Sequence, residues 1–418
     1  MAGNNALCTQ CAGMNFGNGA AAKNAIMADS WSRAAGYAPA LPISQHRAPA
    51  ISSTLAALKH HKRAIIDRYS RPDNGRGLAQ VLTTLLPLAA LWAGVAFSVA
   101  VSYWLTACLV AVMSLFLVRV FILMHECGHR SLFRSHRLNA VFGFIFGVVS
   151  GMPAYVWSQH HRFHHSTNGN WAKYRGPLNI IAVDEYAALS TRQQRHYRYA
   201  RNIWLAPVGG FLYLIFNPRM TWIRGSASLL CHLLRRKIAQ PGISFAAHAR
   251  DFKTPHWANA HEYWQMFWNN LVLLGLWGLM AWAVGPPLFL VCHIVSLSLA
   301  GGAGILLFTV QHNFEHAYAS HNAHWDYHAA VIEGTSFLAL PRWANWFTAN
   351  IAYHHIHHLS ASIPNYRLAA CHNEHPQLFA GVTRIRLSQI PQALKYILWD
   401  THARCIVSVA EYQQHMRL

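Results

Sequence analysis

Two long stretches without a charged side chain constrain this chain more than any other feature. Residues 78–118 contain no Lys, Arg, Asp or Glu, and none occurs from Tyr263 up to Glu315. At about 1.5 Å per helical residue, the first stretch alone is roughly twice as long as a bilayer crossing requires. Each stretch is therefore predicted to form a hairpin of two membrane-spanning helices, and Pro286-Pro287 marks the turn of the second. The four spans are predicted over residues 79–100, 103–123, 265–284 and 288–310.

The composition and the distribution of charge agree with an integral membrane protein. Of the 418 residues, 53% are hydrophobic and only 11% are charged. The turns near Tyr103 and Pro286 carry no Lys or Arg, so the positive-inside rule places both termini and the central segment in the cytoplasm. The formal net charge of +20 resides mostly in these segments. An anionic membrane surface explains this charge, and we expect no nucleic-acid partner.

The remaining segments are assigned around the spans. The apolar stretches Leu138–Trp157 and Ile203–Phe216 are predicted to be interfacial or re-entrant helices, with aromatic side chains at the headgroup level. Residues 1–50 are expected to be a disordered leader, residues 51–400 the membrane domain and residues 401–418 a C-terminal tail. Cys8 and Cys11 form a CxxC pair in the leader, and the eight cysteines show no disulfide framework.

Three histidine clusters follow or lie between the predicted spans. Their sequences are HECGH from His125, HRFHH from His161 and HHIHH from His354. Offsets of three and four residues bring side chains to one face of a helix. The clusters supply eight potential ligands: His125, His129, His161, His164, His165, His354, His357 and His358. One ion rarely needs so many ligands, so a binuclear metal site is predicted.

The predicted topology places all three clusters on the cytoplasmic side, as a shared site requires. A ninth ligand is expected from His312 or His316, which are four residues apart just past the fourth span; His312 is favoured because it is nearer the end of that span. Acidic residues are scarce in this chain, and those near the clusters can orient imidazoles or simply cap helices. The residues considered for such a supporting role are Glu126, Glu315, His316 and Asp326.

Three kinds of chemistry compete for these residues. HECGH matches HExxH, the zinc-protease motif in which Glu is the general base, but a protease leaves the other two clusters unexplained. A metal transporter would need ligands inside the spans rather than at their ends. Nitrogen ligation without a tuned acid–base pair favours redox chemistry, in which iron and O2 attack an unactivated C–H bond. The substrate is then expected to enter from the bilayer, as an acyl chain would.

The order HECGH, HRFHH, QHNFEH and HHIHH resembles the membrane fatty-acyl desaturases. Trp157, Ser166-Thr167-Asn168 and Ile363-Pro-Asn-Tyr-Arg367 also resemble that family, most of all its bacterial and cyanobacterial omega-6 (delta-12) acyl-lipid branch. The resemblance covers about residues 60–400. His160 departs from the pattern, because that branch more often has a single leading histidine there.

The resemblance implies an all-α integral membrane fold, with four spans in two hairpins and a cytosolic helical cap that holds two iron ions. It implies that the eight cluster histidines and His312 are the ligands, that O2 is the oxidant and that a cis double bond enters a lipid acyl chain. The expected location is the bacterial inner membrane. Because no His-Pro-Gly-Gly motif of a fused haem domain is present, a separate ferredoxin or b-type cytochrome is expected to donate electrons. A hydroxylase or carotenoid oxygenase would use the same ligands and remains the alternative.

Overall fold

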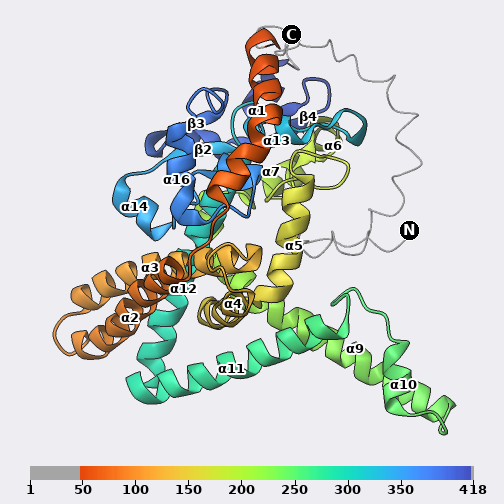
Figure 1. Cartoon of the computed structure of the whole chain (residues 1–418). Coiled ribbons are helices and arrows are strands. Elements are labelled where there is room, and N and C mark those ends of the chain that lie inside the picture. The colour runs from red at the N-terminus through yellow and green to blue at the C-terminus, as the bar shows by residue number, and fades with distance from the viewer. Residues whose placement is uncertain (1–47, 416–418) are drawn as a thin grey trace.

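The computed structural model describes residues 48–415, and the side chains of residues 54–414. The predicted leader therefore lies outside the described residues, apart from its last three positions. The Cys8–Cys11 pair lies outside them as well. The first described element is α1 (Ala48–Tyr69), which runs along the outside of the cap (Figure 1).

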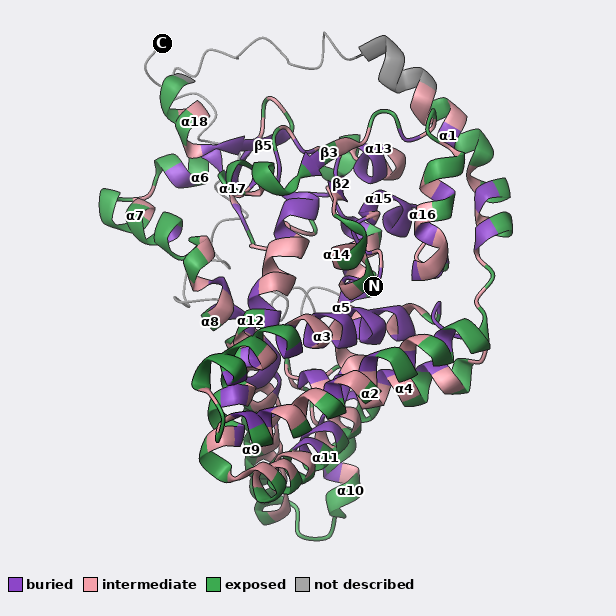
Figure 2. Cartoon of the chain, turned by 90° about the vertical axis from the view of Figure 1, so that its left-hand side faces the viewer, coloured by how far each residue is buried: buried purple, intermediate pink, exposed green. Residues whose placement is uncertain are grey.

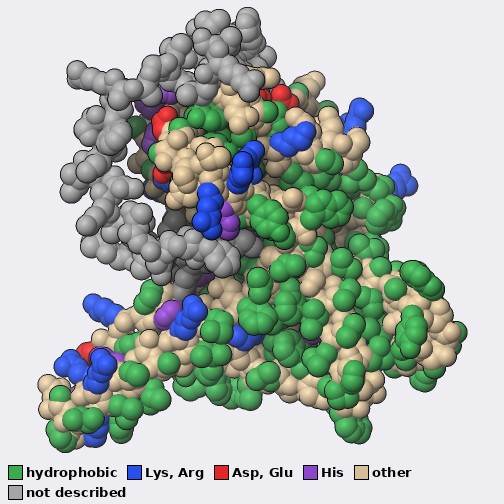
Figure 3. Space-filling model, turned by 180° about the vertical axis from the view of Figure 1, so that it is seen from behind, with side chains coloured by type: hydrophobic (Ala, Val, Ile, Leu, Met, Phe, Trp, Pro, Cys, Tyr) green, Lys and Arg blue, Asp and Glu red, His purple; other side chains and the backbone are tan. Residues whose placement is uncertain are grey.

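Four long apolar helices form two hairpins in the lower half of the molecule. They are α2 (Asn74–Ser98), α3 (Tyr103–His129), α11 (Ala260–Val284) and α12 (Pro286–His312). Each is long and apolar enough to cross a bilayer. Hydrophobic side chains are spread over the lower surface in Figure 3. The chain is an integral membrane protein, and the prediction of a helical membrane fold with four spanning helices is confirmed.

These helices extend past the predicted spans at the end that meets the cap. The side chain of Asp73 accepts a hydrogen bond from the backbone N–H of Arg76 at 2.8 Å and so caps α2 in front of its apolar run. α3 continues to His129, and its C-cap residue Arg130 has a left-handed φ of 60°. The first histidine cluster therefore belongs to the last turns of a spanning helix.

The segment between the hairpins begins with a sharply bent pair of helices. α4 (His136–Ser150) and α5 (Ala154–Thr167) meet at an angle of 99°. Gly151, with φ of 79°, and Pro153 lie at the bend, where neither residue favours a continuous helix. The predicted re-entrant stretch Leu138–Trp157 is thus two helices, and α5 turns upward into the cap (Figure 1).

The second predicted interfacial stretch, Ile203–Phe216, is an irregular helix. It comprises a 3₁₀ turn, then α8 (Ala206–Phe211) and then a π-helical turn that leads into α9 (Asn217–Ala239). α8 packs tightly on α12, because a Cβ on Gly210 would lie only 2.2 Å from the carbonyl carbon of Gly301. Small residues allow such close approach of helices within a membrane. α9 and α10 (Phe245–Arg250) extend away from the body of the molecule (Figure 1).

The cap is mostly helical but also contains two small sheets. Besides α1 and α5, its α-helices among the described residues are α6 (Val183–Ala187), α7 (Thr191–Tyr199), α13 (Tyr327–Ile332), α14 (Arg342–Phe347), α15 (His354–Leu359), α16 (Asn365–Glu374), α17 (Ile390–Ala393) and α18 (Val409–His415). One sheet has the order β1-β4-β5, with β1 (Ile181–Ala182) parallel and β5 (Cys405–Ser408) antiparallel to β4 (Tyr396–Asp400). In the other, β2 (Ser336–Ala339) pairs in parallel with β3 (Thr383–Arg386). Part of the predicted tail thus forms β5 and α18.

Candidate metal centre

The histidine clusters meet where the spanning helices join the cap. The first lies on the last turns of α3, the second on α5 and the third on α15, while His312 is the last residue of α12. In Figure 2 buried residues gather along α3 and α15, between the spanning helices and the cap. Segments more than 200 residues apart in the chain therefore face one space.

Nine histidines divide into two groups at this junction. Within each group, one ring nitrogen from every residue lies within 4.8 Å of the others. The five-histidine cluster contains His125, His129, His161, His165 and His357. The four-histidine cluster contains His164, His312, His354 and His358. These nine are the residues predicted as ligands, and α5 and α15 each contribute to both clusters.

The spacing of the nitrogen atoms suits metal ligation. Nε2 of His161 lies 2.9 Å from Nε2 of both His125 and His165. In the other cluster, Nε2 of His312 lies 2.9 Å from that of His354. Two metal–nitrogen bonds of about 2.1 Å at about 90° would hold their nitrogens about 3.0 Å apart. The clusters therefore have the donor type and the spacing that a transition metal requires.

Two further nitrogens support this interpretation. Nε2 of His129 and Nε2 of His357 are buried and have no hydrogen-bond partner among the described residues. Buried polar atoms in native proteins are nearly always paired, so an unpaired nitrogen calls for an ion or a water molecule. Both belong to the five-histidine cluster. The site can thus accept an ion without breaking a hydrogen bond to either atom.

Burial keeps the cap histidines of the site neutral. It lowers the pKa of each well below the usual value of His, and the neighbouring imidazoles lower it further. The residues are His161, His164, His165, His354, His357 and His358. Because metals bind the neutral imidazole, these side chains are held in the form that ligates.

Glu126 supports the site from behind His125. Its Oε1 lies 3.1 Å from Nδ1 of His125, and its Oε2 accepts hydrogen bonds from the Ser131 hydroxyl and the Asn365 backbone N–H, both at 3.0 Å. The carboxylate is fully buried. A carboxylate at Nδ1 leaves the Nε2 lone pair of His125 for a metal. Both oxygens are therefore engaged away from the metal space, which is incompatible with the general base of a zinc protease.

Sequence comparison assigns the family. Residues 98–387 match the family model described as fatty acid desaturase. The chain belongs to the fatty acid desaturase family. It is 32% identical to a fatty acid desaturase of Bacillus subtilis over 341 residues, which cover 81% of this chain and 88% of that protein. The desaturase is therefore an oxidoreductase that acts on fatty acids.

More distant relatives have narrower names. An sn-1 oleoyl-lipid 12-desaturase of Picosynechococcus is 25% identical over 254 residues, which cover 59% of this chain and 62% of that protein. An acyl-lipid (9+3)-(E)-desaturase of Dimorphotheca sinuata is 24% identical over 261 residues, covering 60% and 61%. The Bacillus protein is thus more similar to this desaturase than either of these two proteins is.

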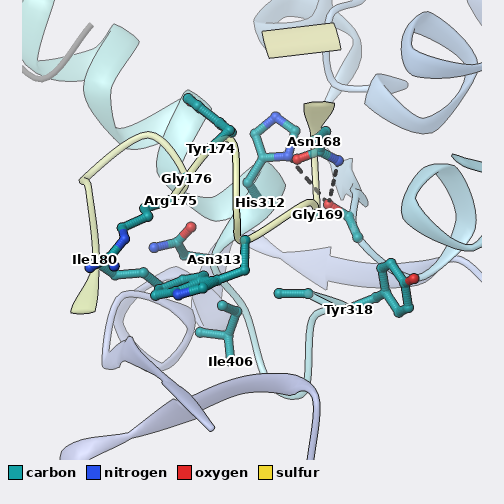
Figure 4. Close-up of a pocket in the computed structure, with 13 residues that line it drawn as sticks. Asn168, Gly169, Tyr174, Arg175, Gly176, Ile180, His312, Asn313, Tyr318 and Ile406 are labelled. Carbon is teal, nitrogen blue, oxygen red and sulfur yellow. Dashed lines mark hydrogen bonds between the residues drawn. The ribbon is translucent and has the colours of Figure 1, made fainter. Parts of the chain in front are cut away.

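A backbone carbonyl orients His312 in the desaturase. Nδ1 of His312 and the side-chain amide of Asn168 both lie 3.3 Å from the Gly334 carbonyl oxygen, at the edge of a small cavity of about 20 Å³ (Figure 4). The carbonyl can only accept, so it fixes the His312 proton on Nδ1 and leaves Nε2 directed at His354. Asn168 holds the same carbonyl in position.

The other predicted supporting residues do not reach the clusters. Nε2 of His316 lies 3.8 Å from a carboxylate oxygen of Glu411, in a separate group that also includes Glu315. Asp326 caps α13 and forms an ion pair with Lys59 at 2.9 Å. These residues are partly or fully exposed and stabilise the surface of the cap.

Several residues of the site were not predicted from the sequence. Asn365 and Ser131 bind Glu126, and the indole of Trp157 stacks on His161 with ring centres 4.5 Å apart. Gly128 allows α3 to approach α5, because a Cβ there would lie 2.9 Å from the Cβ of Ser158. Gly128 is inside the first histidine motif, and Trp157 and Asn365 belong to the segments that resemble the family, but neither signal indicated these contacts.

Proposed function

We propose that the desaturase holds two iron ions, one in each histidine cluster, and inserts a cis double bond at carbon 12 of an acyl chain in a membrane lipid. The division of nine histidines, seven of them buried, into groups of five and four is the observation that carries this proposal. Two sets of neutral nitrogen donors suit two transition-metal ions, and membership of the family favours iron.

The chain itself prepares the site for this reaction. The iron pair would supply the activation of O2 that attack on an unactivated C–H bond requires. Glu126 and the Gly334 carbonyl orient His125 and His312 by binding their Nδ1 atoms. Burial of the clusters excludes bulk water, which would otherwise compete for the ions and quench reactive species.

Apolar side chains beside the clusters favour an acyl substrate. Trp157 stacks on His161, and the ring of Phe308 in α12 lies 5.0 Å from that of His164, centre to centre. Both aromatic residues are only partly buried, on helices that rise from the membrane. The names of the relatives that are called sn-1 oleoyl-lipid 12-desaturases support carbon 12 and a lipid-borne chain.

The clusters face the cytoplasm in this proposal, in a bacterial inner membrane, because the turns within the two hairpins carry no Lys or Arg. Electrons come from a separate ferredoxin or b-type cytochrome. A hydroxylase or carotenoid oxygenase of the same superfamily would share the ligands. The family match and the relatives' names favour the desaturase.

The test is expression in a host that makes oleoyl lipids but lacks a 12-desaturase. The double-bond positions of its lipid fatty acids are determined by mass spectrometry, and iron in the purified protein by elemental analysis. For the wild-type protein we expect a new double bond at carbon 12 and about two irons per chain. His357→Ala should abolish the new double bond and the bound iron. His136→Ala, at an exposed position on α4, is the control and should preserve the double bond and the iron. A bond at another carbon refutes the position, a hydroxylated product refutes desaturation, and zinc alone refutes the iron site.

A further inference from the structure

A cavity separate from the histidine clusters opens between the start of α2, the second half of α3 and α14. Its volume is about 400 Å³, within the range of sites that hold small ligands. Three of its ten lining residues are the arginines Arg76, Arg119 and Arg342, and none is acidic. The cavity is therefore strongly positive.

Arg119 is buried without a counter-ion. Only 3% of its surface is exposed, and its guanidinium donates to Thr84 Oγ1 at 2.9 Å, to Gln80 Oε1 at 3.3 Å and to the Trp346 carbonyl. All three acceptors are uncharged. Among the side chains of residues 54–414, no carboxylate lies within 4.0 Å of any of the three cavity arginines. A buried charge without an opposite charge is costly, so the cavity favours an anion.

The cavity lies at the depth of the lipid headgroups. It is formed where α2 enters and α3 leaves the apolar layer, and Trp346 of α14 packs on Phe116 of α3 with ring centres 5.8 Å apart. Trp343 and Trp346 on α14 remain 61% and 40% exposed. Exposed tryptophans beside a spanning helix are typical of the membrane–water interface. The anion most abundant at that level is the phosphate of a phospholipid.

Hydrogen bonds connect this cavity to the metal centre. Oε1 of Gln80 accepts from Arg119 and, at 2.8 Å, from the side-chain amide of Asn365. The backbone N–H of Asn365 donates to Glu126, which faces His125. An occupant of the cavity would therefore contact Gln80, which two hydrogen bonds connect to Glu126.

We propose that this cavity binds the phosphate of an anionic membrane phospholipid. Arg119 provides a fixed, buried positive charge at its base, and the exposed Arg76 and Arg342 close on the phosphate oxygens from the rim. Arginine suits this task because its planar group can donate two parallel hydrogen bonds to phosphate. The site is separate from the proposed iron centre, so lipid binding is expected with or without iron.

The test is native mass spectrometry of the full chain in detergent, titrated separately with phosphatidylglycerol, neutral diacylglycerol, inorganic phosphate and coenzyme A. Wild-type protein should retain one phosphatidylglycerol per chain. The double variant Arg76→Gln/Arg342→Gln changes two exposed side chains and leaves Arg119 and its packing intact. It should bind this lipid roughly tenfold or more weakly, because two charge-assisted contacts are lost. Arg192→Gln, an exposed change on α7 outside the cavity, is the matched control and should bind like wild type.

Equal binding by wild type and the double variant would overturn the proposal. So would diacylglycerol binding as tightly as phosphatidylglycerol, since the phosphate would then contribute nothing. Binding of inorganic phosphate or coenzyme A in place of the phospholipid would also overturn it and assign the cavity to a soluble anion. Lipid retention is measured on both iron-loaded and iron-free protein, so failure here leaves the iron centre and the desaturation product untouched.

Discussion

Replacing Glu126 with Gln is the sharpest test of how the metal centre is supported. The change keeps the size of the side chain but replaces one of its two acceptor oxygens with an NH2 group, which can only donate. In the native structure its two oxygens face three groups: Nδ1 of His125, the Ser131 hydroxyl and the Asn365 N–H. An amide cannot satisfy all three, because its NH2 must face either the imidazole or the Asn365 N–H.

Both orientations of the glutamine carry a cost. With NH2 toward Asn365, two donors oppose each other and a buried N–H is left unpaired, which costs about 1–3 kcal/mol. With NH2 toward His125, the imidazole proton is driven to Nε2, the nitrogen that must bind metal. A loss of about 1–3 kcal/mol corresponds to roughly 5- to 150-fold weaker metal binding. Outer-sphere changes at metal sites typically cost about 10- to 100-fold, which is consistent with this range.

The assay compares bound iron per chain and new double bonds per cell for wild type, Glu126→Gln and a control. Glu374→Gln is a suitable control, because Glu374 is exposed on α16 and pairs with Arg68. We expect the Glu126 variant to lose most of its iron at limiting supply and to recover part of its activity when iron is abundant. Wild-type iron affinity in Glu126→Gln would refute the orienting role. Complete loss of activity with full iron occupancy would instead indicate direct participation in the reaction.

The remaining predictions concern the ligands and the packing that positions them. His312→Ala should lower iron affinity by more than about tenfold, whereas His316→Ala should change it by about twofold or less, as measured by iron titration. Gly128→Ala should push α3 and α5 apart and reduce bound iron while the protein still folds. Gly210→Ala should lower the free energy of unfolding by about 1–3 kcal/mol through overpacking against α12, measured by thermal unfolding in detergent. Iron removal by a chelator should lower the unfolding temperature of the wild-type protein. Zinc should restore that temperature but not the activity. An unfolding temperature that does not change with the chelator would contradict a structural contribution of the metals.

The spanning helices were predictable because a charge-free run has few alternatives in a bilayer. The ends of these helices were less predictable. α2 starts at Asn74, before the predicted span, because Arg76 can be part of the helix where it lies at the membrane surface. The bend between α4 and α5 depends on Gly151 and Pro153, whose effect on direction cannot be read without the packing around them. The short strands β1 to β5 have too few residues for a two-residue periodicity to stand out.

For the site, helical spacing was enough to identify the histidines but not their grouping. Offsets of three and four residues place His161, His164 and His165 on one face, yet the structure assigns His164 to a different cluster from the other two. That division depends on where α12 and α15 approach α5. The partner of Glu126 is 239 residues away at Asn365, and no local pattern in the sequence could predict this contact.

The way α5 and α15 divide their histidines has a consequence for how the centre is assembled. Each helix provides donors to both pockets, so a first ion that orders α5 and α15 also prepares the second pocket before it is filled. Loading is therefore expected to be cooperative, with empty and doubly loaded molecules predominating when iron is scarce. A cell short of iron would then contain fewer complete enzymes rather than many half-built ones.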